Sequence, residues 1–226
     1  MDTTNHAAGH RQRLRDRFRK APDLLADYEV LELLLGYAIP RRDTKPLAKN
    51  MLEHFGSVAG IMSARPADLE RMDGVGSGVA TFLSLLQECR CRELRGFVRD
   101  REVFSCPDEV ARFAAARLAH SAVEEFWTIL VDNRNRFMDF VRISRGTVDQ
   151  APVYPREILA LVLERQAGGV ILVHNHPGGN LQPSKQDDDL TAKIQDAASK
   201  LDIRILDHII VSDSGYYSYR EQGRMP

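Results

Sequence analysis

Residues 170–187 read VILVHNHPGGNLQPSKQD, and this stretch predicts a strand, a turn and a helix. The four apolar residues at its start are typical of a short strand that is buried on both faces. Side chains two positions apart in a strand point to the same side. His174 and His176 therefore offer two imidazole nitrogens to one point, where the strand ends.

The turn after these histidines can bring an acidic side chain back to them. Prolines and glycines of 177–183 turn the chain sharply, and Ser184 starts a helix whose first turn contains Asp187. Two neutral imidazoles and one carboxylate form the three-ligand set in which a zinc ion keeps a fourth position for water. The pattern predicts a catalytic metal site rather than a structural one.

Each part of the pattern also has a purely structural interpretation. Ser184 and Asp187 match a capping box, in which the carboxylate only satisfies an amide at the start of the helix. An isolated His-x-His pair is more often incidental than ligating. A helix cap does not need two histidines, however, so the combination favours the metal site.

The stretch closely resembles the JAMM motif of the MPN+ metalloprotease superfamily: His-x-His, a spacer of fixed length, and an Asp preceded by a Ser. Here ten residues, 177–186, separate His176 from Asp187, and Ser184 stands three positions before Asp187. The segments VYPRE and LDHII narrow the likeness to the RadC-like family, which joins a helix-hairpin-helix front domain to such a metal domain. Gly178 departs from the serine that is usual in this family after HNHP.

The resemblance implies a role for each residue of the motif. His174, His176 and Asp187 would hold one zinc ion per chain, and Ser184 would stabilise the oxyanion of a tetrahedral intermediate. Zinc held in this way lowers the pKa of a bound water toward ~7 and polarises a carbonyl. The implied reaction is hydrolysis of an amide or isopeptide bond in a peptide or protein substrate.

The superfamily also uses an upstream glutamate, at the start of a strand, as general base. Glu125 opens the predicted strand EFWTILVD and is the candidate for this role. Glu124 is one register away and is the alternative. The structural interpretation of Glu125 is an exposed carboxylate at a strand end.

The pattern along the whole chain predicts an α+β protein of two domains. Residues 1–99 contain helical segments only, whereas residues 100–226 follow the order α-β-β-α-β-α-β-β of a mixed sheet flanked by helices. By the resemblance, the second domain has the MPN (JAMM, cytidine-deaminase-like) fold. Residues 96–105 are the predicted connection. Helices are predicted over 10–20, 28–38, 46–55, 79–94, 107–118, 154–166 and 184–201, and strands over 125–132, 137–143, 170–173, 203–211 and 216–219.

In the front domain, Gly74-Val75-Gly76 forms a tight turn before a long helix. Free amides at such a turn can point to an anion such as a DNA phosphate. The segment resembles the helix-hairpin-helix module, which binds DNA backbones without reading bases. Gly78 and Val79 stand where the module often carries a lysine. The segment is therefore interpreted either as a phosphate-binding turn or as a purely structural hairpin.

The distribution of charge along the chain predicts that the front half, rather than the second half, would bind a polyanion. The chain has 31 Lys and Arg against 32 Asp and Glu, a formal net charge of −1. Residues 1–99 hold 16 basic and 13 acidic side chains, a net charge of +3, and residues 100–226 hold 15 and 19, a net charge of −4. The Arg-rich residues 10–20 are interpreted as a solvated helix face or as an arm that touches phosphate.

Cysteines and hydropathy predict a cytoplasmic protein without membrane contact. Cys89, Cys91 and Cys106 are odd in number and are interpreted as reduced structural thiols. No apolar run approaches the ~18 residues of a membrane span.

The sequence also bears on other functions. A zinc nucleobase deaminase would need His-x-Glu and Cys-x-x-Cys, and the sequence has neither. The serious alternative is a non-catalytic protein associated with DNA or DNA repair, whose zinc domain binds a partner. His208 is interpreted as a satisfied histidine of the sheet, with an indirect partner of the metal site as the other interpretation.

Overall fold

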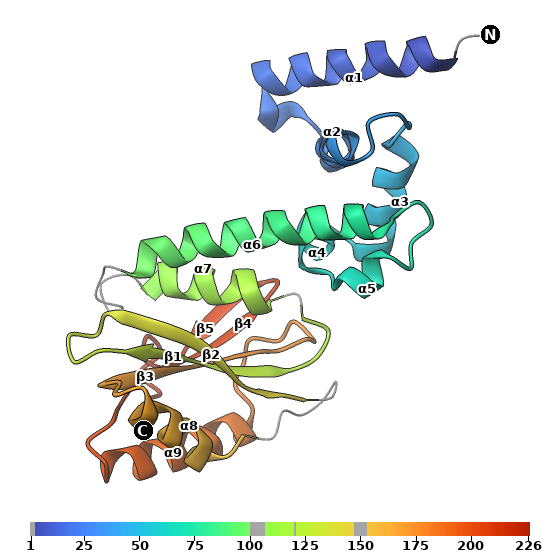
Figure 1. Ribbon diagram of the computed structural model, residues 1–226. Coiled ribbons are helices and arrows are strands. Elements are labelled where there is room, and N and C mark those ends of the chain that lie inside the picture. The colour runs from blue at the N-terminus through green and yellow to red at the C-terminus, as the bar shows by residue number, and fades with distance from the viewer. Residues whose placement is uncertain (1–2, 100–106, 120, 147–152) are drawn as a thin grey trace. The chain divides into compact units, whose positions relative to one another are not determined.

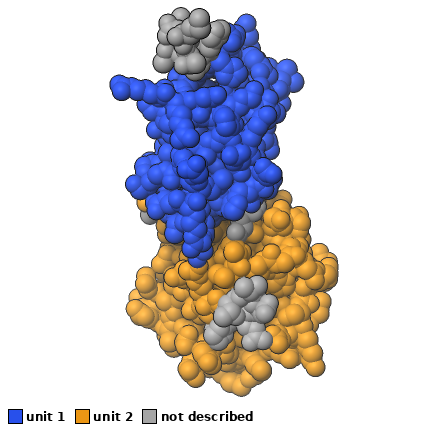
Figure 2. Space-filling view, turned by 90° about the vertical axis from the view of Figure 1, so that its right-hand side faces the viewer, with its two compact units in different colours: residues 1–89 blue, residues 90–226 orange. Residues whose placement is uncertain are grey.

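The computed structural model describes residues 3–99, 107–119, 121–146 and 153–226. The chain divides into two compact units, residues 1–89 and residues 90–226 (Figure 2). The division falls inside one helix, α6 (Ser77–Arg99), which belongs to both units. The predicted connection over 96–105 therefore begins within a helix, since residues 96–99 are helical, and its remainder lies outside the described residues.

Every regular element described in the first unit is a helix, as predicted. The helices are α1 (Thr3–Lys20), the 3-10 helix η1 (Pro22–Leu24), α2 (Asp27–Ala38), α3 (Lys45–Phe55), α4 (Val58–Ser63), α5 (Pro66–Leu69) and the start of α6. Gly56 ends α3 in the left-handed region, at a φ of 77°. Ser57 caps α4 by accepting a 3.0 Å hydrogen bond from the backbone N–H of Gly60.

Two arginines of α1 bind α2. Arg11 donates hydrogen bonds of 2.6–3.3 Å to four backbone carbonyls at and beyond the end of α2, those of Gly36, Ile39, Pro40 and Arg42. The last carbonyls of a helix lack partners within it, and a cation there complements the helix dipole. Arg17 forms an ion pair of 2.6 Å with Glu29. For these two arginines, a contact between helices replaces the predicted solvated face or phosphate-binding arm.

The second unit has the predicted order of elements. They are α7 (Pro107–Leu118), β1 (Glu125–Val131), β2 (Phe137–Arg145), α8 (Pro155–Glu164), β3 (Gly169–Asn175), α9 (Lys185–Ser199), β4 (Arg204–Ser212) and β5 (Gly215–Ser218). The strands form one sheet in the order β2-β1-β3-β4-β5. β3 and β4 run parallel and the other neighbours antiparallel, so the predicted mixed sheet is confirmed.

The sheet separates two apolar cores. α7 lies on one face of the sheet, and α8 and α9 lie on the other (Figure 1). Side chains of β1 alternate between the cores, with Ile129 in the first and Phe126 in the second. All seven residues of β3 are buried, which confirms the predicted strand with two buried faces. His174 shares the side of Leu172, which faces α8 and α9.

The pairing of β3 with β4 contains one irregularity. Leu206 is an extra residue in β4, between Ile205 and Asp207, which pair with successive residues of β3. One extra residue reverses the faces of the side chains that follow it. His208 therefore lies on the same side as its partner Leu172, toward α9.

Two further expectations concern thiols and membranes. Cys89 and Cys91 are reduced thiols, as predicted, whereas Cys106 lies outside the described residues. Within the described ranges, no helix combines the length and the apolar character that a membrane span requires.

Candidate metal centre

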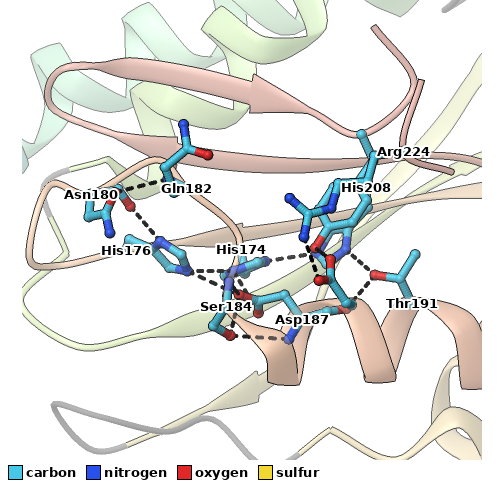
Figure 3. A network of polar contacts seen from close by, with 11 residues as sticks. His174, His176, Asn180, Gln182, Ser184, Asp187, Thr191, His208 and Arg224 are labelled. Atoms are coloured by element: carbon cyan, nitrogen blue, oxygen red, sulfur yellow. Dashed lines mark hydrogen bonds and ion pairs between the residues drawn. The ribbon is translucent and has the colours of Figure 1, made fainter. Parts of the chain in front are cut away.

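The end of β3 delivers both histidines to one place (Figure 3). His174 is fully buried, and His176 lies just beyond the strand, where its backbone N–H donates to the carbonyl of Val211 at 3.1 Å. The Nε2 atoms of the two rings are 3.0 Å apart. The imidazoles thus meet as the alternation of side chains in a strand predicts.

Asp187 reaches the histidines from the first turn of α9. Its Oδ1 atom lies 3.2 Å from Nε2 of His174, and its Oδ2 atom lies 3.6 Å from Nε2 of His176. One donor atom from each residue lies within 4.8 Å of the others. The three side chains form a group that could hold a metal ion.

Asp187 is also part of the predicted capping box. Ser184 donates to Oδ2 of Asp187 from its backbone nitrogen at 2.7 Å and from its hydroxyl at 2.6 Å, and it accepts from the backbone N–H of Asp187 at 3.1 Å. The helix cap is confirmed and is compatible with the predicted metal ligand, because it leaves Oδ1 facing His174. The hydroxyl proton of Ser184 is directed at Asp187, so the predicted oxyanion contact requires this hydroxyl to turn.

The ring of His176 presents a lone pair to the group. Its Nδ1 atom lies 2.5 Å from the backbone carbonyl of Asn180, which can only accept, so Nδ1 carries a proton. In the neutral ring Nε2 is then unprotonated and faces His174 and Asp187. Acceptor atoms that converge in this way need a cation or a proton between them. Imidazole nitrogens with a carboxylate oxygen are a donor set that suits zinc.

The charges within the group are coupled. Burial alone would raise the pKa of Asp187, but hydrogen bonds with His174 and His176 hold this pKa well below its usual value. The same carboxylate raises the pKa of His176, against the opposing effect of burial. The group therefore favours an ionised carboxylate beside positive charge, which a metal cation would supply.

Glu125, the predicted general base, lies on the opposite side of the sheet from His174. Its carboxylate accepts hydrogen bonds from Nε1 of Trp127 at 3.0 Å and from Oγ of Ser121 at 3.3 Å. Two arginines of β2 also lie 3.6 and 3.8 Å from it. Because Trp127 packs in the core under α7, this carboxylate faces away from the metal group. This position does not support the predicted role of Glu125 as general base, which stays a prediction.

Glu124, the alternative, is on the side of the histidines. It stands two residues before Phe126, whose ring stacks on His174 with centroids 5.8 Å apart. Burial raises the pKa of Glu124 against the effect of His174, and Asp187 adds to the increase. Neighbouring residues of a strand point to opposite faces of the sheet, and the sequence does not fix the register of this strand. Both glutamates were therefore candidates for the general base.

Asn175 stands between the two histidines in the sequence. Its side chain is fully buried and points to the opposite face of the sheet from theirs. Its amide forms hydrogen bonds with the backbone of residues 121–125, the segment that contains both glutamates. Strand alternation predicts the direction of this side chain but not its partners. The role of Asn175 was therefore missed.

His208 is satisfied, as predicted, and its partner is a residue of the metal group. Its Nε2 atom lies 2.8 Å from Nδ1 of His174, and its Nδ1 atom lies 2.6 Å from Oγ1 of Thr191. Thr191 was not predicted, although its spacing of one helical turn from Asp187 could have indicated it. The side on which His208 lies depends on the extra residue in β4, which the sequence pattern does not reveal.

The predicted DNA-binding turn lies between α5 and α6 in the first unit. Gly74 has a φ of 88°, Gly76 is exposed, and Val75 is buried in the helical core, where its backbone N–H donates to the carbonyl of Met72 at 3.1 Å. The guanidinium of Arg42 lies 3.1 Å from the position that a Cβ atom would occupy at Gly74. Arg42 therefore places a cation at this turn, which the sequence did not indicate.

A comparison with known families identifies the second unit. The family model described as RadC-like JAB domain matches residues 104–224, more than half of the chain. The matched span contains the whole five-stranded sheet and the group of His174, His176 and Asp187. The resemblance stated for the HNHP segment is thereby confirmed, and the chain belongs to the RadC-like JAB domain family.

Proposed function

We propose that the chain is a zinc-dependent hydrolase of the JAMM type, which cleaves an amide or isopeptide bond in a peptide or protein. One observation carries the proposal: Nε2 of His174, Nε2 of His176 and a carboxylate oxygen of Asp187 meet at the end of a buried strand. A half-buried carboxylate, that of Glu124, interacts electrostatically with all three. A purely structural metal site would not need this neighbouring base.

His174, His176 and Asp187 would hold the ion as two neutral imidazoles and one carboxylate. Zinc bound by such a set supplies a Lewis acid for the substrate carbonyl and lowers the pKa of a water in the remaining position toward ~7. His174 is fully buried and His176 only partly so. The group is therefore accessible to substrate from the side of His176.

Glu124 accepts a proton from the attacking water and passes it to the leaving nitrogen. Burial, against the effect of His174, raises the pKa of Glu124, and a raised pKa makes a carboxylate a stronger general base. Ser184 orients Asp187 in the resting site. During the reaction its hydroxyl turns from Asp187 to the oxyanion.

Two adjacent glutamates provide the test. Zinc-loaded wild-type protein, Glu124→Gln and Glu125→Gln are compared on a panel of peptide and isopeptide substrates. Glu124→Gln is expected to keep its zinc and lose hydrolysis by at least about 100-fold, because proton transfer is lost. Glu125→Gln makes the same chemical change on the other face of the sheet and should hydrolyse at the wild-type rate. Full activity of Glu124→Gln would contradict the assignment of the base.

A second candidate function is non-catalytic association with DNA through the first unit. Arg42 supports it, since this residue lies beside Gly74 in the turn before α6, and a cation and helix-terminal amides together suit a phosphate. Affinity for duplex DNA should fall steeply with salt and should fall further in Arg42→Ala than in the exposed control Arg13→Ala. Equal affinities of the two variants, or no binding at low salt, would leave the turn a structural element.

A further inference from the structure

We propose that His208 is a positioning residue for His174, and that Thr191 sets the tautomer of His208. The proposal rests on the proposed function in one respect, since it takes His174, His176 and Asp187 as the metal site. The supporting contacts form a chain of hydrogen bonds from the backbone of one ligand, Asp187, to the ring of another, His174 (Figure 3).

A single hydroxyl proton decides the direction of this chain. Oγ1 of Thr191 lies 2.6 Å from the backbone carbonyl of Asp187, which can only accept, so Thr191 donates there. The same oxygen lies 2.6 Å from Nδ1 of His208, so it accepts from that nitrogen. Nδ1 of His208 therefore carries a proton.

The other nitrogen of His208 must then be an acceptor. The ring is fully buried, and its two hydrogen-bond partners are an uncharged hydroxyl and a second imidazole, an environment that favours the neutral form. Nε2 of His208 is consequently unprotonated. It accepts a 2.8 Å hydrogen bond from Nδ1–H of His174.

This hydrogen bond prepares His174 as a ligand. With the proton on Nδ1, its Nε2 atom keeps a lone pair, which faces His176 at 3.0 Å and Asp187 at 3.2 Å. The opposite tautomer would direct an N–H bond at the metal position and would place two lone pairs against each other between His174 and His208. A partner on the other ring nitrogen fixes the tautomer and orientation of a ligating histidine.

Packing holds the ring of His208 where this contact requires it. Tyr219 stacks on this ring, with ring centroids 4.9 Å apart and an interplanar angle of 15°. The ring centroid of Phe126 lies 5.7 Å from that of His208. The extra residue Leu206 in β4 turns His208 toward this side of the sheet. The histidine is thus fixed by its strand, by aromatic contacts and by both ring nitrogens.

The tautomer can be measured in the wild-type full chain without any metal. Long-range proton–nitrogen NMR correlations of the histidine rings should show His208 protonated at Nδ1 and unprotonated at Nε2. The signals are assigned by their disappearance in His208→Gln. Thr191→Val removes the acceptor at Nδ1 and should abolish the preference for this tautomer. A proton on Nε2 of His208 in the wild type would overturn the proposal.

Metal affinity provides a second, independent test. His208→Leu introduces an apolar side chain of similar size that has no hydrogen-bond acceptor. This variant should bind zinc and cobalt about 10- to 100-fold more weakly than the wild type. His208→Gln can place its Oε1 atom near the former Nε2 position and should recover most of the affinity and the wild-type visible spectrum of bound cobalt. Ile209→Val, in the same strand but facing the other core, is the control and should bind as the wild type does.

The outcomes separate this proposal from the proposed function. If folded His208→Leu binds zinc as tightly as the wild type, the positioning role is wrong while the metal site stands. If the wild type binds no zinc, the proposed function fails, and the NMR measurement still decides the tautomer.

Discussion

The side-chain oxygen of Asn175 accepts a 2.8 Å hydrogen bond from the backbone N–H of Glu125. The amide nitrogen of Asn175 donates to the backbone carbonyls of Ser121 and Val123, at 3.4 and 3.1 Å. One buried side chain, located between the two metal-group histidines, thus fixes the segment that contains Glu124. The three residues of the metal group and Glu124, the proposed base, are thus connected through β3.

Asn175→Ala should lower the free energy of unfolding by about 2–3 kcal/mol, because a buried N–H and two carbonyls lose their partner. Urea unfolding measures the change. Asn180→Ala, in the exposed turn after the histidines, is the matched control and should cost less than about 1 kcal/mol. Equal stabilities of the two variants would show that the amide of Asn175 does not hold the segment.

Ser184→Ala should lower the free energy of unfolding by about 1 kcal/mol through loss of the helix cap, and it should also weaken zinc binding, because Asp187 loses a hydrogen bond that orients it. Ser184→Thr keeps the hydroxyl and should retain both properties. Calorimetric titration with zinc and thermal unfolding measure the two effects. Wild-type zinc affinity in Ser184→Ala would exclude an orienting role.

Zinc should change how stability depends on pH. In the metal-free protein, a hydrogen bond with Asp187 raises the pKa of His176 above 6.5. A raised pKa stabilises the fold below about pH 6.5, and this contribution is lost as the pH rises through the raised value. Although burial opposes it, hydrogen bonding lowers the pKa of Asp187, whose contribution is present above about pH 4 and is lost in acid.

These shifts predict opposite trends with and without metal. The metal-free protein should lose stability as the pH rises above about 6.5, whereas zinc needs an unprotonated His176 and should add stability over the same range. Scanning calorimetry across this range, with and without zinc, measures both profiles. Parallel profiles would mean that zinc binding does not involve the histidine.

Arg11→Met should destabilise the first unit by about 1–2 kcal/mol, since it removes hydrogen bonds to four carbonyls at the end of α2. Methionine keeps much of the aliphatic stem, so the change reports mainly on the guanidinium. Arg13→Met on the same helix is exposed and should change stability by less than about 0.5 kcal/mol. The reverse order would contradict the assigned contact.

Much of the fold could be predicted because hydrophobic periodicity and helix ends are local properties. The helix predicted over 46–55 ends where Gly56 adopts a positive φ, and Ser57, a residue type that favours helix starts, caps the next helix. The buried strand at 170–173 and its continuation into His174 followed from a run of apolar residues. The length of α6 could not be predicted, because Gly96 suggested a connection where the helix continues to Arg99.

The residues of the site whose positions follow from their spacing in the sequence could be predicted. His174, His176 and Asp187 come together because strand alternation and a short turn place them there. Glu124 and His208 depend instead on the register of β1 and on the extra residue in β4, which are set by pairing between distant strands. Sequence periodicity near a strand end does not fix that register.

The most direct measurement is the zinc content of the purified chain after dialysis, determined by elemental analysis. The wild type should hold about one zinc ion per chain, and both His174→Ala and Asp187→Ala should lose most of it. Asp188→Ala, which removes the next carboxylate along α9, one paired with Arg224 and Tyr219, should keep its zinc. Full zinc content in His174→Ala and Asp187→Ala, or none in the wild type, would contradict the metal site.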